Sequence, residues 1–191
     1  MSATAGLLLA AGGGTRYGMP KALAHDGAWL LGALAALRDG GCDPVRVILG
    51  ARADEAMELL PEPNIAVVAV DWASGMAASL RAGLAALTAV PGAVPSEAAL
   101  VHLVDLPDVG APVIRRVAAL AAPGVVARAA YHGRPGHPVL LGRDHWAAVA
   151  GAANGDHGAR DWLAGRADLV TVECGDLALG HDRDTSDSGL A

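Results

Sequence analysis

Glycines and cations gather in one short loop near the start of the chain. The stretch from Gly12 to Lys21 holds four glycines together with Arg16. Glycine lets backbone N–H groups wrap around an anion, because no Cβ blocks the approach and positive φ angles cost little. Arg16 and Lys21 add two cations, which suit a charge spread over several phosphates. The loop is therefore a candidate phosphate-binding site; the alternative is a flexible glycine turn with two solvated, solvent-facing cations.

Two well-known glycine loops do not fit this spacing. A P-loop has its lysine directly after the last glycine, whereas Lys21 stands three residues beyond Gly18. A dinucleotide-binding loop has the pattern Gly-x-Gly-x-x-Gly, and here Gly12 and Gly14 are followed by Gly18, one residue too late. That class also needs an acid at the end of the second strand, where residues 50–52 supply none.

Asp105 is the candidate metal-binding carboxylate. It follows an apolar stretch with the character of a buried strand, and Pro107 stiffens the chain just after it. A rigid carboxylate at a strand end suits magnesium, which prefers oxygen ligands. The alternative is a helix N-cap, a role that Asp108 could equally fill for the helix expected from Pro112.

Gly75, Met76 and Ser79 open a helix that follows the third expected strand. A small residue and a hydroxyl at this place could meet the edge of a nucleotide base. The spacing alone favours an ordinary first helical turn over a base-binding segment.

One histidine stands apart from the others. His137 lies between Gly136 and Pro138, in what we expect to be a stiff turn before a strand. A second glycine-rich loop contains Asp156 and His157. A lone histidine is usually structural or solvated, and that is the expectation for the remaining candidates, His25, His102, His132 and His145.

Strand-length apolar runs alternate with helix-length amphipathic segments, which predicts an α/β fold with a mostly parallel sheet between two layers of helices. Ligands in such sheets bind at the carboxyl ends of the strands, here after Ala10, Val70 and Val104. The expected strands are 6–10, 45–49, 65–70, 98–104, 124–130, 138–141 and 169–172. The expected helices are 29–39, 53–59, 76–87, 112–121, 144–150 and 159–164, with a loop at 90–96.

Composition limits the classes of protein that this chain can represent. Its 191 residues suit one domain spanning 1–191, and 53% hydrophobic against 18% charged residues excludes disorder. The net charge of −6 (14 − 20) argues against nucleic-acid binding. No apolar run reaches the ~18 residues of a membrane span. Cys42 and Cys174 are far apart, so we expect no disulfide and a reducing, cytoplasmic setting.

Five segments in order resemble the MobA-like nucleotidyltransferase superfamily, most closely its molybdenum cofactor cytidylyltransferase branch. They cover nearly the whole chain, and the resemblance implies a three-layer, Rossmann-like nucleotidyltransferase fold. The segments are Leu9-Ala10-Ala11-Gly12-x-Gly14-x-Arg16 with Pro20-Lys21, Ser74-Gly75-Met76-x-x-Ser79-Leu80, Val104-Asp105-Leu106-Pro107, Gly133-x-x-Gly136-His137-Pro138 and Gly155-Asp156-x-Gly158-Ala159-Arg160.

The resemblance also implies roles for the candidate residues. Ala10, Ala11, Gly12 and Gly14 would bind the nucleotide with Gly75 and Ser79, while the cations Arg16 and Lys21 would stabilise charge on the reacting phosphates without acting as bases. Asp105 would bind Mg²⁺, and His137 and Asp156 would face the acceptor substrate.

The C-terminal residues depart from the family pattern. The family often ends in Asp-x-Asp-Thr-Pro-Glu-Asp-Leu, whose first acid resembles a second magnesium ligand. This chain keeps Asp182, Asp184 and Thr185 but lacks the following proline. Asp182 is therefore the candidate second ligand, and a loose acidic tail over 182–191 is the alternative.

The implied activity is transfer of CMP from CTP to a molybdopterin-type cofactor with release of pyrophosphate, and a molybdoenzyme is the partner it implies. Leu9 to Gly12 resembles the cytidine branch more than the guanosine branch, so a guanylyltransferase is a weaker alternative, as is transfer to another small phosphate. Residues 16–23 also resemble members of the superfamily called nicotine blue oxidoreductases, although no dinucleotide-binding loop is present. A non-catalytic carrier of molybdopterin would not need Lys21 or Asp105.

Overall fold

A computed structural model of the chain describes residues 4–88 and 96–183, and its centre is a seven-stranded sheet in the order β3-β2-β1-β4-β6-β5-β7. Among these strands β6 runs antiparallel to its neighbours β4 and β5, and the other pairings are parallel. The strands are β1 Thr4–Ala10, β2 Val45–Leu49, β3 Ala66–Val68, β4 Ala98–Leu103, β5 Val126–Tyr131, β6 Arg134–Gly142 and β7 Val170–Glu173.

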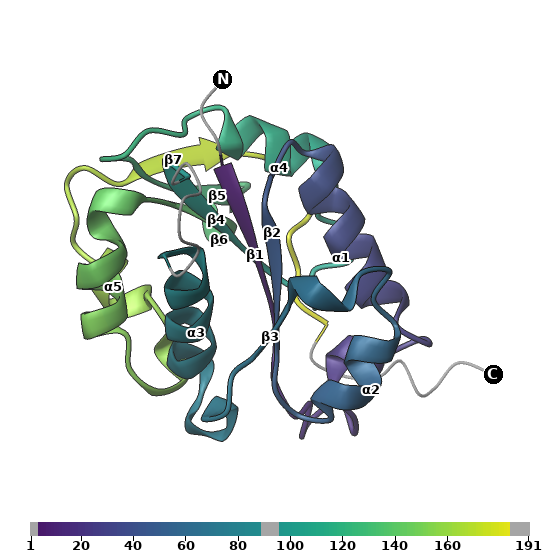
Figure 1. Cartoon of the computed structure of the whole chain (residues 1–191). Helices are drawn as coiled ribbons and strands as arrows, with labels where there is room; N and C mark the ends of the chain where they lie inside the picture. The colour runs from purple at the N-terminus through teal and green to yellow at the C-terminus, as the bar shows by residue number, and fades with distance from the viewer. Residues whose placement is uncertain (1–3, 89–95, 184–191) are drawn as a thin grey trace.

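Helices cover both faces of the sheet, as Figure 1 shows, with α3 and α5 on one side and α1, α2 and α4 on the other. The helices are α1 Ala28–Asp39, α2 Ala53–Glu58, α3 Met76–Thr88, α4 Ala111–Ala118, α5 Trp146–Ala152 and α6 Arg160–Leu163. Neighbouring strand residues point to opposite faces, so Leu8 and Leu100 join the core beneath α1 and α4, whereas Leu7 and Val101 join the core beneath α3 and α5. The predicted α/β class and mostly parallel sheet are confirmed.

Several boundaries differ from the sequence-based expectation. β3 ends at Val68 because the chain turns away from the sheet, and Val70 is 84% exposed although it is apolar. β6 begins at Arg134, so His137 lies within a strand and not in a turn before one. The predicted loop at 90–96 falls almost wholly on residues 89–95, and Asp184 and Thr185 fall on 184–191; both stretches lie outside the described residues.

The order of the strands places a ligand-binding edge between β1 and β4. The chain moves outward from β1 to β2 and β3, then returns to add β4 on the other side of β1. Ligands in parallel sheets bind at such a switch point, outside the carboxyl ends of the strands. The glycine loop follows β1, and Asp105 comes two residues after β4, so the fold brings the two strongest candidate segments to one edge.

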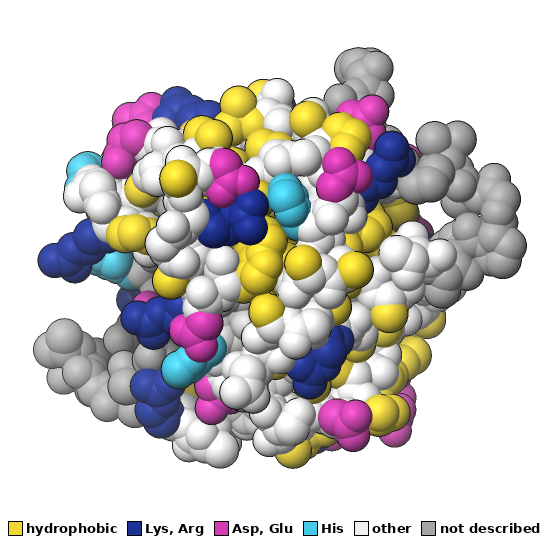
Figure 2. Space-filling model, turned by 90° about the vertical axis from the view of Figure 1, so that its left-hand side faces the viewer, with side chains coloured by type: hydrophobic (Ala, Val, Ile, Leu, Met, Phe, Trp, Pro, Cys, Tyr) yellow, Lys and Arg dark blue, Asp and Glu magenta, His cyan; other side chains and the backbone are white. Residues whose placement is uncertain are grey.

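The surface has mixed charge on the face that Figure 2 shows, where cationic and anionic side chains lie interspersed and form no broad basic patch. Among the described residues, no helix combines the length and the apolar character needed to cross a membrane.

Candidate active site

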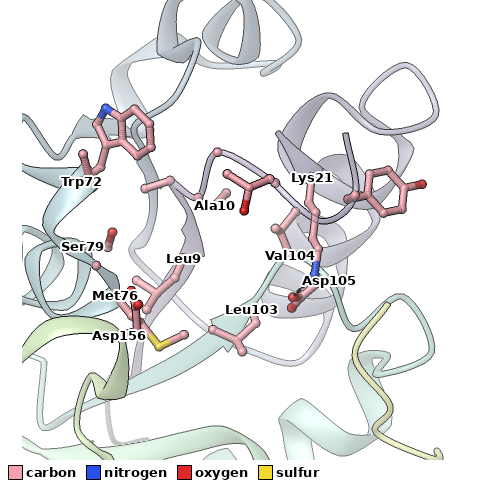
Figure 3. A pocket seen from close by; sticks show the side chains of 18 of the residues that line it. Leu9, Ala10, Lys21, Trp72, Met76, Ser79, Leu103, Val104, Asp105 and Asp156 are labelled. Atoms are coloured by element: carbon pink, nitrogen blue, oxygen red, sulfur yellow. Dashed lines mark hydrogen bonds and ion pairs between the residues drawn. The ribbon is translucent and has the colours of Figure 1, made fainter. Parts of the chain in front are cut away.

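A cavity of about 490 Å³ opens at the carboxyl ends of β1 and β4. The glycine loop forms one side, the start of α3 forms another, and Asp105 lies at the end near Lys21 (Figure 3). Ten of the twelve predicted site residues line this cavity: Ala10, Ala11, Gly12, Gly14, Arg16, Lys21, Gly75, Ser79, Asp105 and Asp156. The structure therefore brings together segments that are far apart in the sequence.

The glycine loop is held in a tight turn that requires glycine at one position. Gly14 has φ +61°, and a Cβ added there would lie 1.7 Å from the carbonyl oxygen of Met19. The N–H of Gly18 closes the turn by donating to the carbonyl of Gly14 at 2.7 Å. This turn leads the chain back to Lys21, which begins a short 3-10 helix beside the cavity.

Lys21 and Asp105 form an ion pair at one end of the cavity (Figure 3), with Lys21 Nζ 2.8 Å from Asp105 Oδ2. Their side chains are only 15% and 19% exposed. Lys21 is thus not the solvated cation of the alternative interpretation, because it is paired with Asp105 and largely buried. The pair fixes both charged groups at the switch point.

Asp105 has one oxygen that suits a hard cation. Its Oδ1 is buried and has no hydrogen-bond partner among the described residues. Magnesium usually binds through one or two carboxylates and completes its shell with water and substrate phosphates. The described residues hold no group of three or more His, Cys, Asp or Glu side chains that would form a cation cage by themselves. Asp105 together with bound phosphates therefore fits a divalent cation of this kind.

The side of the cavity opposite Lys21 is formed by α3 and the residues just before it. Gly75 and Met76 lie at the helix start, and the buried Ser79 lies one turn later, as predicted. Trp72 also lines the cavity (Figure 3), a residue that the sequence analysis missed. A Cβ at Gly50 would lie 2.5 Å from its ring, so this glycine allows the indole to pack against the backbone after β2.

Asp156 is drawn to the cavity by the packing of two glycines. Gly75 has φ +111°, and a Cβ there would lie 2.5 Å from the backbone of Gly155 and 2.6 Å from Asp156 Oδ1. The close approach of these segments places the carboxylate of Asp156 beside the N-terminus of α3.

A second cavity of about 580 Å³ adjoins the first, and the two share Leu9, Met76, Leu103 and Asp156. His137 and Asp182, the remaining predicted site residues, line this second cavity and not the first. Burial and the nearby Arg128 lower the pKa of His137 to about 4, although Asp182 opposes the shift. His137 is therefore neutral at neutral pH.

The C-terminal segment returns to the carboxyl edge of the sheet and is tied to the loop after β4. Asp108 Oδ2 accepts hydrogen bonds from the backbone N–H groups of Leu179 and Gly180, at 2.8 and 2.9 Å. The N–H of Arg183 donates to the carbonyl of Asp105 at 3.0 Å. The alternative role of Asp108 as a helix N-cap is wrong, because the N-cap of α4 is Gly110 and no side chain caps that helix.

The histidines assigned by default to structural or solvated positions divide between those two classes. His102 is completely buried in β4, with neither ring nitrogen hydrogen-bonded to a described residue. His25 is exposed and within hydrogen-bond distance of the Tyr17 hydroxyl, whereas His145 is half-buried and a ring nitrogen lies 3.0 Å from the carbonyl oxygen of Gly124. None of these three lines either cavity.

Comparison with known proteins identifies a family and several relatives. The model of the MobA-like NTP transferase domain matches residues 6–171. The nicotine blue oxidoreductase of Paenarthrobacter nicotinovorans is 38% identical over 192 residues, which cover 94% of this chain and 91% of that protein.

Among solved structures, Rv0371c from Mycobacterium tuberculosis H37Rv is similar, with a TM-score of 0.75 and 26% identity over 96% of this chain and 94% of that one. A complex of the same protein with manganese has a TM-score of 0.74 and 25% identity, with the same coverage of both chains.

Proposed function

The chain belongs to the MobA-like NTP transferase family, and on that premise we propose that it transfers CMP from CTP to a molybdopterin-type cofactor and releases pyrophosphate. The observation that carries the proposal is the Lys21–Asp105 pair beside the glycine loop, with Asp105 Oδ1 left without a hydrogen-bond partner in residues 4–88 and 96–183. This arrangement combines a phosphate-binding loop, a fixed cation and a free carboxylate oxygen in one cavity. A molybdoenzyme that still lacks its cofactor is the partner that would receive the product.

The first cavity holds the triphosphate in this proposal. The backbone N–H groups from Gly12 to Gly14 bind its phosphates, and Arg16 and Lys21 add positive charge where negative charge develops on the α-phosphate and on the leaving pyrophosphate. Asp105, together with the second acid Asp182, would hold a divalent cation, and such a cation would supply positive charge to neutralise the triphosphate.

The reaction itself needs no base from the protein. A phosphate oxygen of the acceptor, already ionised, forms a bond to the α-phosphorus of CTP. The bond from the α-phosphorus to the bridging oxygen breaks, and pyrophosphate leaves with the electron pair. The protein contributes position and charge, because holding two reactants in line supplies much of the rate.

The acceptor occupies the second cavity, which meets the first at Asp156. His137 is neutral and offers a ring nitrogen to a polar group of the acceptor, while Asp156 lies at the border where the two substrates meet. Preference for cytidine rests on the resemblance of Leu9-Ala10-Ala11-Gly12 to the cytidine branch.

The test is a thermal-shift panel of CTP, GTP, ATP, UTP and TTP, each with magnesium, with manganese and with EDTA. A ligand that binds only the native state raises stability by about 2.7 kcal/mol at a hundredfold excess over its Kd. We expect CTP with a metal to give the largest shift. Asp105→Asn keeps the shape and removes the charge, so it should abolish the metal-dependent part and spare the rest. Equal shifts with and without metal in the wild-type protein would contradict the proposed site.

A second candidate function is supported by the 38% identity to a nicotine blue oxidoreductase. It would reduce an organic acceptor in the second cavity with a hydride from a nicotinamide or flavin cofactor. The sequence contains no dinucleotide-binding loop, so the cofactor would have to use the first cavity. A purified protein that is yellow from bound flavin, or that is stabilised by NADH and not by any NTP, would favour the oxidoreductase.

A further inference from the structure

Two arginines from different elements line the second cavity. Arg128 is in the middle of β5, where its Cα pairs with Val139, and both residues line the cavity. Arg160 is the first residue of α6 and lines the same cavity. They are close enough that the charge of Arg160 lowers the pKa of Arg128, in addition to the larger effect of burial.

Neither guanidinium has a carboxylate partner among the described residues. The Nε of Arg128 is buried and makes no hydrogen bond there, which is uncommon because buried polar atoms are nearly always satisfied. A half-buried cation left beside a second cation costs stability, and folded proteins keep such groups mainly where a ligand completes them.

The acids that line the cavity are directed elsewhere. Asp182 lies close enough to His137 to oppose, without reversing, the lowering of the His137 pKa. Asp156 Oδ1 lies against Gly75 at the border with the first cavity. His137 is neutral, and His157 is paired with Asp161 at 3.0 Å. The two arginines thus keep their positive charge available to an anion.

The remaining lining is apolar. Its side chains come from the ends of β1 and β4, from α3, from β6 and from α6, and they are Leu9, Met76, Leu80, Val101, Leu103, Leu106, Val139, Leu141 and Leu163. A purely ionic ligand would leave this surface exposed to water, so the cavity suits a molecule with an apolar body.

We propose that Arg128 and Arg160 form an oxyanion-binding subsite, and that the second cavity takes an acceptor with an apolar body and a phosphate or carboxylate group held between these two guanidinium groups. The identification of the bound molecule as the acceptor rests on the proposed nucleotidyl transfer; the subsite itself does not. Arginine suits this role because its planar fork can bind an oxyanion through two parallel hydrogen bonds.

The test uses small probes that separate the two parts of the ligand. Phenyl phosphate has both a ring and a phosphate, benzoate has a ring and a carboxylate, phenol has no anion and inorganic phosphate has no ring. Each is titrated into the full-length protein labelled with ¹⁵N, and the shifted backbone amides locate the site. We expect phenyl phosphate or benzoate to shift the amide signals of Gly136, His157 and Leu163. The probe that binds more tightly identifies whether the subsite prefers a phosphate or a carboxylate.

Variants then test the arginines. Arg128→Met or Arg160→Gln should weaken binding of the tighter probe by about tenfold or more, since each removes a charge-assisted hydrogen bond. Arg38→Gln is the matched control, because Arg38 lies on α1, on the opposite face of the sheet, and its exposed pair with Glu62 is remote from the cavity. Arg128→Met should also unfold at the same temperature as the wild-type protein or a higher one, whereas a purely structural arginine would lower it.

Three results would overturn the subsite: unchanged probe binding in both arginine variants, phenol binding as tightly as phenyl phosphate, or shifts confined to the glycine loop. Failure of the nucleotidyltransferase proposal would look different. In that case the NTP panel would give no metal-dependent shift, while the probes would still bind and still depend on Arg128 and Arg160.

Discussion

The ion pair between Lys21 and Asp105 allows stability and activity to be separated in one set of variants. Replacing Lys21 with Met keeps most of the apolar stem and removes the charge, which leaves the Asp105 carboxylate without its lysine partner. Breaking a fully buried pair costs about 3–5 kcal/mol. These side chains are 15% and 19% exposed, so solvent screens part of the loss and we expect about 2 kcal/mol.

For a chain of 191 residues this loss corresponds to a fall in Tm of about 4–8 °C. In Asp105→Asn the remaining partner is a lysine, which can extend toward water. The double variant Lys21→Met/Asp105→Asn contains no unpaired charge, so it should be more stable than the sum of the two single changes predicts. The expected coupling energy is about 2 kcal/mol.

The assay is urea unfolding of the four proteins in EDTA, together with turnover measured with metal and CTP. Turnover should be lost in both single variants and should stay lost in the double variant, although stability recovers. A coupling energy below about 0.5 kcal/mol would refute the ion pair as a stabilising contact. Recovery of turnover together with stability would refute a direct role for Lys21 and Asp105 in the reaction.

Three other outcomes are expected. Arg16→Ala should cut turnover by about a hundredfold or more, a loss on the order of 3 kcal/mol of transition-state stabilisation, with little change in urea unfolding; near-normal turnover would reject its role. Asp182→Asn should impair metal-dependent turnover, and Asp108→Ala should do so more weakly by releasing the C-terminal segment, as a metal titration of both variants would reveal. His102→Leu should flatten the pH dependence of stability. Burial lowers the pKa of His102 to about 3 and that of His137 to about 4. As the pH falls below 6.5, the unfolded chain therefore binds protons that the native state does not, and the native state loses stability. Between about pH 4 and 7, the slope of the unfolding free energy against pH should be smaller in this variant by up to ~1.4 kcal/mol per pH unit. An unchanged slope would contradict a buried, neutral His102.

Sequence periodicity was sufficient for most of the fold. Residues that point to either face of β1 are apolar because helices cover both faces of the sheet, and α1 buries Leu30, Leu34 and Leu37 and ends before Gly40. The pattern failed where an apolar residue leaves the sheet. Val70 belongs to an apolar run by sequence, yet the chain turns at Ala69, whose N–H donates to Leu49, and Val70 is left exposed.

The site could be predicted segment by segment, but its contacts could not. The glycine loop and Asp105 each carry a local pattern, whereas their ion pair joins residues 84 positions apart. Trp72 was missed because its place in the cavity depends on Gly50, which gives no local indication of an indole packed against it. Arg128 could not be singled out for a similar reason, because in the sequence of β5 it resembles an ordinary solvent-facing cation.

If the two cavities have the proposed roles, they would allow one fold to serve both the NTP transferase family and the oxidoreductase named for one relative. The first cavity is built from backbone amides, glycines and one fixed ion pair, all set by the switch point between β1 and β4. The second takes its character from single side chains on β5, β6 and α6, which can change without disturbing the sheet. Under the proposed assignment of the two cavities, we expect exchange of Arg128 or Arg160 to alter the acceptor while the glycine loop stays intact. On that proposal the fold constrains the nucleotide end of the site more strongly than the acceptor end.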